Sequence, residues 1–430
     1  MSEQSRWSWA RWRAPLVAGA AILLSVAAAA CTENLDGGVA CPSLCPSQDE
    51  PFRDTTFDAV VLDTSLAGYP TLGLSSTLLL ANRPDTLVTR AVLRFDQLAT
   101  SYQPNGTGTL DSITTVDSVY IVLPLDTTGR RGSTPVTLEV FDVDTTASDS
   151  VASVVRSLFR SDRRIGSLTV TPSATGDSLR IPIGRAALES KIANRSRFRV
   201  GLQISGGSGQ LRVRAFQLGA GAPTLRYDPR TDTLYRPIIL GTNTSISNTT
   251  TDVLLAYQVY ALTDLGSAGV SPGTLVVGGY PAHRSYLRFN VPLRITDSST
   301  IVRAELLLTQ TRSRFGNAND TVALIPLVPT TTDSINNLRR VLDLAAEGAF
   351  ASVDTAVLVP SDSGLRTLNV LALARTWRTL PLNVPRAVAF RIGLEGAQPA
   401  ELRFFSSEAA AGLRPRLRIT YLPRADFVLP

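Results

Sequence analysis

The side chains that most often carry catalysis are few in this chain and do not cluster along the sequence. His283 is the only histidine among 430 residues. An imidazole could act as a general base, but the sequence of residues 280–283 predicts a turn that leads into a strand. One histidine also supplies too few ligands for a zinc site. We therefore predict neither a metal centre nor histidine-based catalysis.

Two groups of oxygen-bearing side chains have the composition of a calcium site. Asp142 and Asp144 stand two residues apart on a predicted strand and so share one face, and Asn317, Asn319 and Asp320 share a loop. Such oxygens are the ligands of Ca²⁺, and paired carboxylates also work as acid and base. A solvated strand end and a hairpin turn are the simpler interpretations. We therefore predict no cofactor, with a structural calcium ion as the alternative.

Arginine and tyrosine provide the candidate ligand-binding residues. Arg94 and Arg288 each stand between apolar neighbours that a strand would turn inward. A groove-facing arginine could bind the carboxylate of an acidic sugar, whereas an outward arginine paired with an acid is the simpler interpretation. Tyr280 and Tyr286 could add a stacking platform. Trp377 lies in an apolar segment, and we expect it to pack in the core.

Composition and motifs argue against several classes of function. The formal net charge is +6 at pH 7, and no basic run with interleaved aromatic residues occurs, so we predict no nucleic-acid partner. The sequence contains no nucleophile elbow, phosphate-binding loop or dinucleotide fingerprint. We therefore predict that the protein is not an enzyme. A polysaccharide lyase, which can work with Tyr, Arg and Lys alone, is the enzymatic alternative.

The N-terminus is typical of an exported protein. Arg6, Arg11 and Arg13 precede an uncharged apolar run over residues 16–30 that ends in three alanines. The run is shorter than the ~20 residues that span a bilayer. A basic start, a short apolar core and a small-residue end describe a signal peptide, which we assign to residues 1–30.

The segment Ala28-Ala29-Ala30-Cys31 resembles the lipobox of bacterial lipoproteins, in which a cysteine after small residues carries the lipid. The family usually has leucine where Ala28 stands. The resemblance implies that Cys31 is lipid-modified and that its acyl chains anchor the protein stably to a membrane. Thr32 follows instead of an aspartate, which by resemblance to the enterobacterial sorting rule favours the outer membrane.

Cys41 and Cys45 lie in a Pro- and Gly-rich segment just after the predicted lipid site. In an oxidising envelope we expect them to form a local disulfide, because no further metal ligands lie nearby. The small loop that this bond would close adds little stability. Residues 31–54 are therefore predicted to form a lipidated, flexible tether.

Apolar residues recur at alternate positions through most of the chain after residue 55. Within residues 118–125, for example, Val119, Ile121, Leu123 and Leu125 occupy every second position. This spacing is typical of a strand with one buried face. Many short strands separated by turn residues predict an all-β fold of the sandwich or jelly-roll type.

The β-rich unit occurs twice. Residues 92–96 match 286–290, and residues 198–202 match 390–394, in the same order along the chain. A helical pattern follows an Asp-Ser pair in both copies, and such pairs suit helix N-caps. These two patterns begin at Val151 and Ile335. We predict two tandem jelly-roll-like β-sandwich domains, each with one short helix, over residues 55–230 and 236–424.

The chain also resembles a tandem pair of DNRLRE (disaggregatase-related) domains. The motifs that carry the resemblance are Leu93-Arg94-Phe95, Leu287-Arg288-Phe289, residues 370–377 ending in Trp377, Phe405-Ser406-Ser407-Glu408 and Arg414-Pro415-Arg416-Leu417. The first copy lacks the tryptophan and the Ser-Ser-Glu run. The resemblance implies a jelly-roll β-sandwich of the carbohydrate-binding type, and it does not specify a ligand.

These observations predict a non-catalytic envelope protein, lipid-anchored in the outer membrane, that presents two β-sandwich modules. The modules would bind or pack against polysaccharide or envelope proteins. An accessory subunit of an outer-membrane complex is the alternative.

Overall fold

The structure is a computed structural model that describes most of the chain after residue 51. The described residues are 52–57, 60–69, 76–103, 108–126, 134–147, 151–171, 177–215, 221–229, 237–242, 259–266, 269–313, 320–330, 350–352 and 355–423. The signal peptide, Cys31 and the Cys41–Cys45 disulfide lie outside these residues. So do Asn317, Asn319 and the helical pattern from Ile335, and these predictions are therefore left open.

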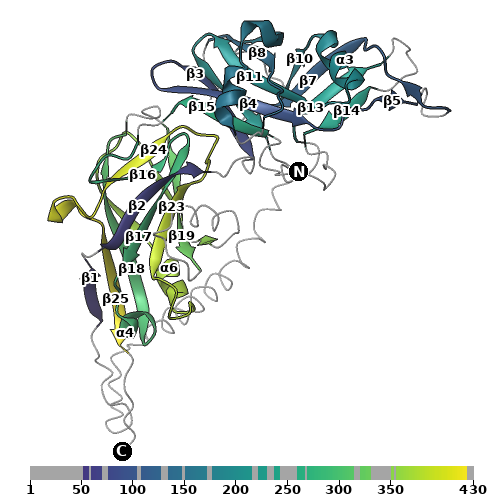
Figure 1. Cartoon of the computed structure of the whole chain (residues 1–430). Coiled ribbons are helices and arrows are strands. Elements are labelled where there is room, and N and C mark those ends of the chain that lie inside the picture. The colour runs from purple at the N-terminus through teal and green to yellow at the C-terminus, as the bar shows by residue number, and fades with distance from the viewer. Residues whose placement is uncertain are drawn as a thin grey trace, which may run out of the picture. The chain divides into compact units, whose positions relative to one another are not determined.

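Antiparallel strands make up most of the described chain, which confirms the predicted all-β sandwich fold (Figure 1). The alternation seen in the sequence matches the burial of the side chains. In β7 (Ser118–Pro124), Val119, Ile121 and Leu123 are buried and their neighbours are partly exposed. Strands form here because one face of each can leave water at regular intervals of two residues.

The first sandwich combines a larger and a smaller sheet. The larger sheet has the order β12 (Gly209–Arg214), β3 (Thr77–Arg83), β4 (Leu87–Phe95), β11 (Phe198–Gly206), β8 (Val136–Asp142) and β9 (Arg164–Val170), with β15 (Val259–Leu265) paired to β4. The smaller sheet has the order β10 (Ser178–Pro182), β7, β13 (Thr224–Asp228) and β14 (Ile238–Gly241). A short pair, β5 (Ser101–Tyr102) and β6 (Asp111–Ser112), forms a separate two-stranded sheet.

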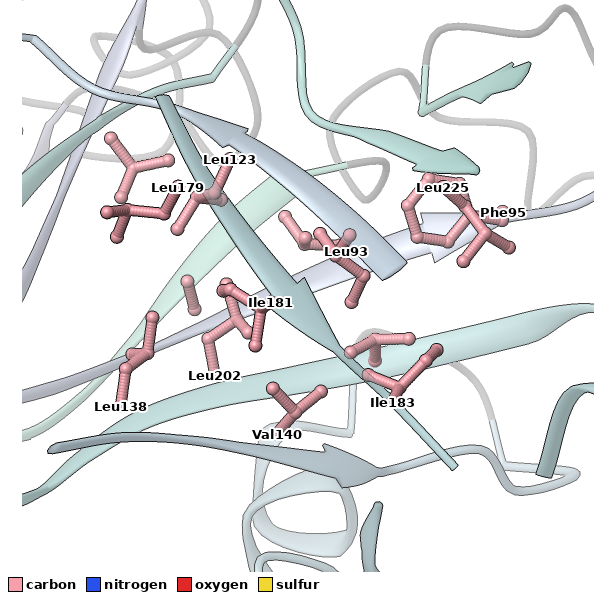
Figure 2. Close-up of a cluster of buried hydrophobic side chains, with 14 of the residues drawn as sticks. Leu93, Phe95, Leu123, Leu138, Val140, Leu179, Ile181, Ile183, Leu202 and Leu225 are labelled. Atoms are coloured by element: carbon pink, nitrogen blue, oxygen red, sulfur yellow. The ribbon is translucent and has the colours of Figure 1, made fainter. Parts of the chain in front are cut away.

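The two sheets of the first sandwich share one hydrophobic core (Figure 2). Leu93 and Leu202 come from the larger sheet, and Ile181 and Leu225 come from the smaller one. All four side chains are fully buried. Burial of such side chains stabilises the fold by about 1.5–3 kcal/mol each.

The second sandwich is built on one continuous path of strands. The order is β1 (Arg53–Phe57), β25 (Arg416–Pro423), β18 (Ser299–Thr311), β24 (Glu401–Phe405), β16 (Thr274–Gly278), β17 (Ala282–Phe289), β23 (Ala387–Ile392), β19 (Val322–Pro329) and β20 (Phe350–Ser352). Three more strands pair to the side of this path: β2 (Val60–Tyr69) with β17, β21 (Ala356–Leu358) with β19, and β22 (Gly364–Asn369) with β18.

The long strand β18 connects the layers of the second sandwich. Its residues up to Leu307 pair with β25, whereas Gln310 and Thr311 pair with β24. Both layers contribute to a second core, which contains Leu287, Leu306 and Trp377. Trp377 is fully buried and its Nε1 donates a hydrogen bond to the Ala387 carbonyl oxygen at 3.3 Å. The predicted core position of Trp377 is therefore confirmed.

Short helices fill the connections between strands. They are α2 (Ala152–Ser157), α3 (Arg185–Ala193), α4 (Leu293–Thr296) and α6 (Leu371–Trp377), with 3-10 turns at Ser161–Arg163 and Ala411–Leu413. The helix predicted from Val151 is α2, and its Val155 packs against Val92 and Tyr260 on the outer face of the larger sheet. None of the helices in the described part of the chain is long and apolar enough to cross a membrane.

Strand pairing crosses between the two sequence repeats in both directions. β14 and β15 belong to the second repeat by sequence, yet they pair with β13 and β4 of the first. β2 belongs to the first repeat, and β1 runs into it from residues 53–54, which were predicted as tether, yet these strands pair with β17 and β25 of the second repeat. The predicted ranges 55–230 and 236–424 therefore describe the sequence repeat, and each sandwich takes its closing strands from the other range.

Candidate functional site

The two predicted arginines occupy matching places in the two sandwiches. Arg94 lies on β4 between Leu93 and Phe95, and both neighbours are in the first core. Arg288 lies on β17 between Leu287 and Phe289, which are in the second core. Because side chains alternate along a strand, both arginine side chains project from the face of their sheet that is opposite to the core.

Arg94 already has an internal counter-ion. Its Nε lies 2.9 Å from Oδ1 of Asp96 and also donates a hydrogen bond to Oδ2 at 3.0 Å. The Arg94 side chain is only 2 % exposed. The predicted pairing with an acid is present, although the acid stands two residues further along the chain, directly after the end of β4, and not on a neighbouring strand. This ion pair leaves Arg94 little access to a ligand.

The carboxylates of Asp142 and Asp144 likewise form ion pairs with basic side chains. Nζ of Lys191 lies 2.9 Å from Asp144 Oδ2 and 3.4 Å from Asp142 Oδ2. Nε of Arg197 lies 3.1 Å from Asp144 Oδ1. These acids are thus part of a partly buried ion-pair network rather than a solvated strand end. Within the described ranges, no group of three or more His, Cys, Asp or Glu residues could hold a metal ion.

Arg288 differs from Arg94 in the residue that stands two positions further along the chain. Asn290 stands where the first copy has Asp96. Among the described residues, Arg288 has no ion-pair partner, and its side chain is partly exposed. The charge of this guanidinium is therefore available to an anion from outside the chain.

Arg288 lines a pocket of about 420 Å³ in the second sandwich. The wall comes from the end of β17, from α4 and from the loop before β23, with Asn290, Leu293, Leu382 and Arg386 among its residues. Leu293 and Leu382 are 48 % and 72 % exposed. The pocket thus combines cationic and amide groups with an apolar rim.

Arg386 adds a second positive charge and holds the loop in place. Its Nη1 donates hydrogen bonds to the carbonyl oxygens of Pro381 at 2.9 Å and Val384 at 2.8 Å. Its Nη2 lies 3.7 Å from Oδ1 of Asp297, which partly balances the charge. The side chain is buried, so Arg386 shapes the wall while Arg288 supplies the accessible guanidinium.

A partly buried guanidinium of this kind suits a carboxylate, sulfate or phosphate group. Arginine presents its N–H groups in a planar fork that matches two oxygens of such an anion. The side-chain amide of Asn290 can donate a further hydrogen bond. The pocket therefore presents N–H donors of Arg288 and Asn290 at a place where an acidic group would fit.

The two predicted tyrosines lie in cores instead of on the surface. Tyr286 is fully buried with Leu327, Ala387 and Ala389. Tyr280 packs with Leu79 and other residues of the first repeat, and burial raises the pKa of its hydroxyl well above the usual value. Neither ring face is open to a sugar, so these residues give no support to a stacking platform.

His283 is buried on β17, one residue after the strand begins. Burial lowers the pKa of its imidazole, and the nearby charge of Glu401 acts in the opposite direction. The ring is therefore neutral near pH 7 and is part of the packed sheet. Its place on the strand agrees with the predicted turn-to-strand segment.

Sequence reasoning found Arg288 but not the pocket around it. The replacement of Asp96 by Asn290 was visible in the matched segments and is the signal that separates the two arginines. Arg386, Leu293 and Leu382 come from segments whose approach to Arg288 depends on the fold. No local motif marks them.

Comparisons with known proteins do not assign a function to the site. No family model and no curated protein matches the chain. A two-domain protein of unknown function from Bacteroides fragilis is 7 % identical, covers 73 % of this chain and 94 % of its own, and has a TM-score of 0.14. The STIV MCP is 8 % identical, covers 87 % and 99 %, and has a TM-score of 0.13. At these scores neither likeness identifies a function.

Proposed function

We propose that this chain is a non-catalytic, lipid-anchored protein of the outer membrane whose second sandwich binds an acidic group through Arg288. The acidic sugars of an envelope or extracellular polysaccharide are the proposed ligand class. The export signal and lipobox-like cysteine in the sequence support the location. The pocket beside Arg288 supports the binding.

One observation carries the binding proposal: the difference between Asp96 and Asn290. In the first sandwich, Oδ1 of Asp96 lies 2.9 Å from Nε of Arg94 and balances its charge. In the second, the amide at the matching position supplies no negative charge, and no acid in the described part of the chain pairs with Arg288. An uncompensated, partly buried charge is costly unless an ion pairs with it, so an anionic ligand gains where a neutral one does not.

Affinity electrophoresis of the full chain tests this proposal. Gels that contain a polyuronate such as alginate should retard the protein, and gels that contain neutral dextran should not. Arg288→Gln should abolish the retardation, because it keeps a polar side chain and removes the charge. The exposed Arg164, which pairs with Glu139 in the first sandwich at 2.7 Å, provides the matched control, and Arg164→Gln should migrate as the unaltered chain does.

Retardation of the Arg288→Gln variant equal to that of the unaltered chain would contradict the assigned site. Equal migration of the unaltered chain in alginate and dextran gels would contradict the acidic ligand class. A sulfated polymer in a third gel distinguishes carboxylate from sulfate recognition.

A further inference from the structure

Another pocket lies on the first sandwich, where β4, β15 and α2 meet. It has a volume of about 370 Å³. Its polar wall consists of Arg90 from β4, Arg156 from α2 and Asp264 from β15, and its apolar wall includes Val88 and Leu265. The side chain of Arg156 is 39 % exposed. The charged groups of this pocket are therefore within reach of a ligand from outside.

One carboxylate serves both arginines of this pocket. Nε of Arg90 lies 2.8 Å from Oδ2 of Asp264, and Nε of Arg156 lies 2.6 Å from Oδ1. Two guanidinium charges therefore meet a single carboxylate charge, which leaves one positive charge in excess. Burial lowers the pKa of Arg90, Asp264 raises it, and the charge of Arg156 lowers it again. Because the pKa is lowered on balance, the one acid does not fully stabilise the two cations.

The equivalent arginine of the second sandwich has an acid of its own. Arg284 stands at the place of Arg90 when Leu287 is matched with Leu93. Its Nε and Nη2 donate hydrogen bonds to the two carboxylate oxygens of Glu395, at 2.8 and 2.7 Å. This bidentate pair balances the charge of Arg284 one for one.

The first sandwich lacks the matching acid. Gln203 follows the matched segment of the first repeat, where Glu395 follows that of the second. Gln203 lies directly opposite Arg90 on β11, and its amide supplies no negative charge. The residue opposite Gln203 on β8 is Glu139, which pairs with Arg164 at 2.7 Å. Asp264 is therefore the acid that Arg90 shares with Arg156.

The two guanidinium groups are oriented by further contacts and still keep donors for a ligand. Cζ of Arg90 lies over the ring of Phe159, 4.8 Å from its centroid, and Nη1 of Arg90 donates a hydrogen bond to the Arg156 carbonyl oxygen at 3.2 Å. Nη2 of Arg156 donates to the Thr263 carbonyl oxygen at 3.1 Å. Among the residues that the structure describes, Nη2 of Arg90 and Nη1 of Arg156 have no such acceptor. Two different side chains thus each offer one nitrogen to the same ligand.

We propose that Arg90 and Arg156 form a binding site for a sulfate ester group of a polysaccharide. A sulfate ester carries a single negative charge, which matches the one positive charge in excess, and its oxygens can accept from two separate side chains. A planar carboxylate suits the fork of one guanidinium instead. A phosphate monoester carries about 1.5–2 negative charges near pH 7, and Asp264 repels the additional charge.

This site is separate from the pocket of Arg288 and differs from it in ligand chemistry. The choice of a polysaccharide as the carrier of the ester rests on the proposed function, whereas the charge balance at Arg90 and Arg156 does not. The experiment below therefore uses a chain in which the Arg288 site is removed.

Affinity electrophoresis of the full chain with Arg288→Gln tests the site. Gels that contain dextran sulfate should retard this variant, and gels that contain neutral dextran or alginate should not. The additional change Arg156→Gln should weaken the affinity for dextran sulfate about tenfold. The matched control is the additional change Arg160→Gln, which removes the same formal charge close to α2. Arg160 pairs with Asp162 at 3.1 Å and does not line the pocket, so this control should migrate as its parent does.

Asp264→Asn, added to the same parent, should act in the opposite direction. It removes the acid that both arginines share, so the charge in excess rises and retardation by dextran sulfate should increase. A loss of local packing would weaken binding, and an increase is therefore a result that a merely structural role of Asp264 does not produce.

Two results would overturn the inference. Equal retardation of the Arg156→Gln and Arg160→Gln variants would show that dextran sulfate responds to net charge alone. Retardation by phosphorylated dextran equal to that by dextran sulfate would contradict the match of a single charge. Alginate retardation that persists in the Arg288→Gln chain would instead count against the proposed function, and the comparison in dextran sulfate would still decide the site at Arg90 and Arg156.

Discussion

Asn290→Asp gives the second sandwich an acid at the position where Asp96 forms an ion pair with Arg94 in the first. Asp96 lies 2.9 Å from Nε of Arg94, and residue 290 has the same spacing from Arg288 along the chain, directly after the end of β17. We therefore expect the new carboxylate to pair with Arg288 and to repel an acidic ligand. The substitution changes one amide for a carboxyl of nearly the same size, so the fold should be preserved.

The size of the effect follows from the interaction that is lost. A hydrogen bond to a charged group contributes about 1.5–3 kcal/mol net. Since about 1.4 kcal/mol corresponds to a tenfold change in affinity, polyuronate binding should weaken about 10- to 100-fold. Isothermal titration with an oligouronate at low salt measures this directly, because screening by salt weakens the interaction.

Asn290→Ala is the matched control for the charge. It removes the amide without adding a carboxylate, so it should retain more affinity than Asn290→Asp. Equal affinity of Asn290→Asp and the unaltered chain would refute the reasoning, since the counter-ion would then have no effect. Equal losses in both variants would show that the amide, and not the charge balance, determines binding.

Three further predictions concern the rest of the molecule. Asp96→Asn removes the counter-ion of the buried Arg94 and should lower the free energy of unfolding in urea by about 1–3 kcal/mol, whereas an unchanged midpoint would contradict the ion pair. Burial lowers the pKa of His283 below 6.5, so the unfolded chain binds the proton more readily than the folded one. The free energy of unfolding should therefore fall as the pH drops below 6.5. His283→Gln should flatten this pH dependence, and an unaltered slope of the free energy of unfolding against pH would contradict the assignment. Cys31→Ser should abolish incorporation of labelled fatty acid and release the protein from the membrane fraction, and continued labelling would contradict lipidation at Cys31.

The sequence alone predicted the strands well because their signal is local. Burial at every second position, as in Val119, Ile121 and Leu123, depends only on which face of a strand leaves water. The partners of the strands could not be predicted in the same way. Ser65 and Ser285 are 220 residues apart, and the exchange of closing strands between the repeats has no counterpart in the apolar pattern of β2.

The candidate site was predicted in part for the same reason. The matched segments placed Arg94 and Arg288 at equivalent positions, and the structure keeps that equivalence. Tyr280 and Tyr286 looked suitable for stacking, but the packing of Leu79 and Leu327 against them depends on contacts distant in sequence. Whether a polar or aromatic side chain on a strand is exposed depends on what covers its sheet face, and periodicity does not report this.

A crystal structure with a bound oligouronate tests most directly whether the Arg288 pocket holds an acidic group. We predict a carboxylate within hydrogen-bond distance of the Arg288 guanidinium, beside Asn290 and the rim formed by Leu293 and Leu382. An oligouronate bound elsewhere on the chain, with the Arg288 pocket empty, would contradict the account.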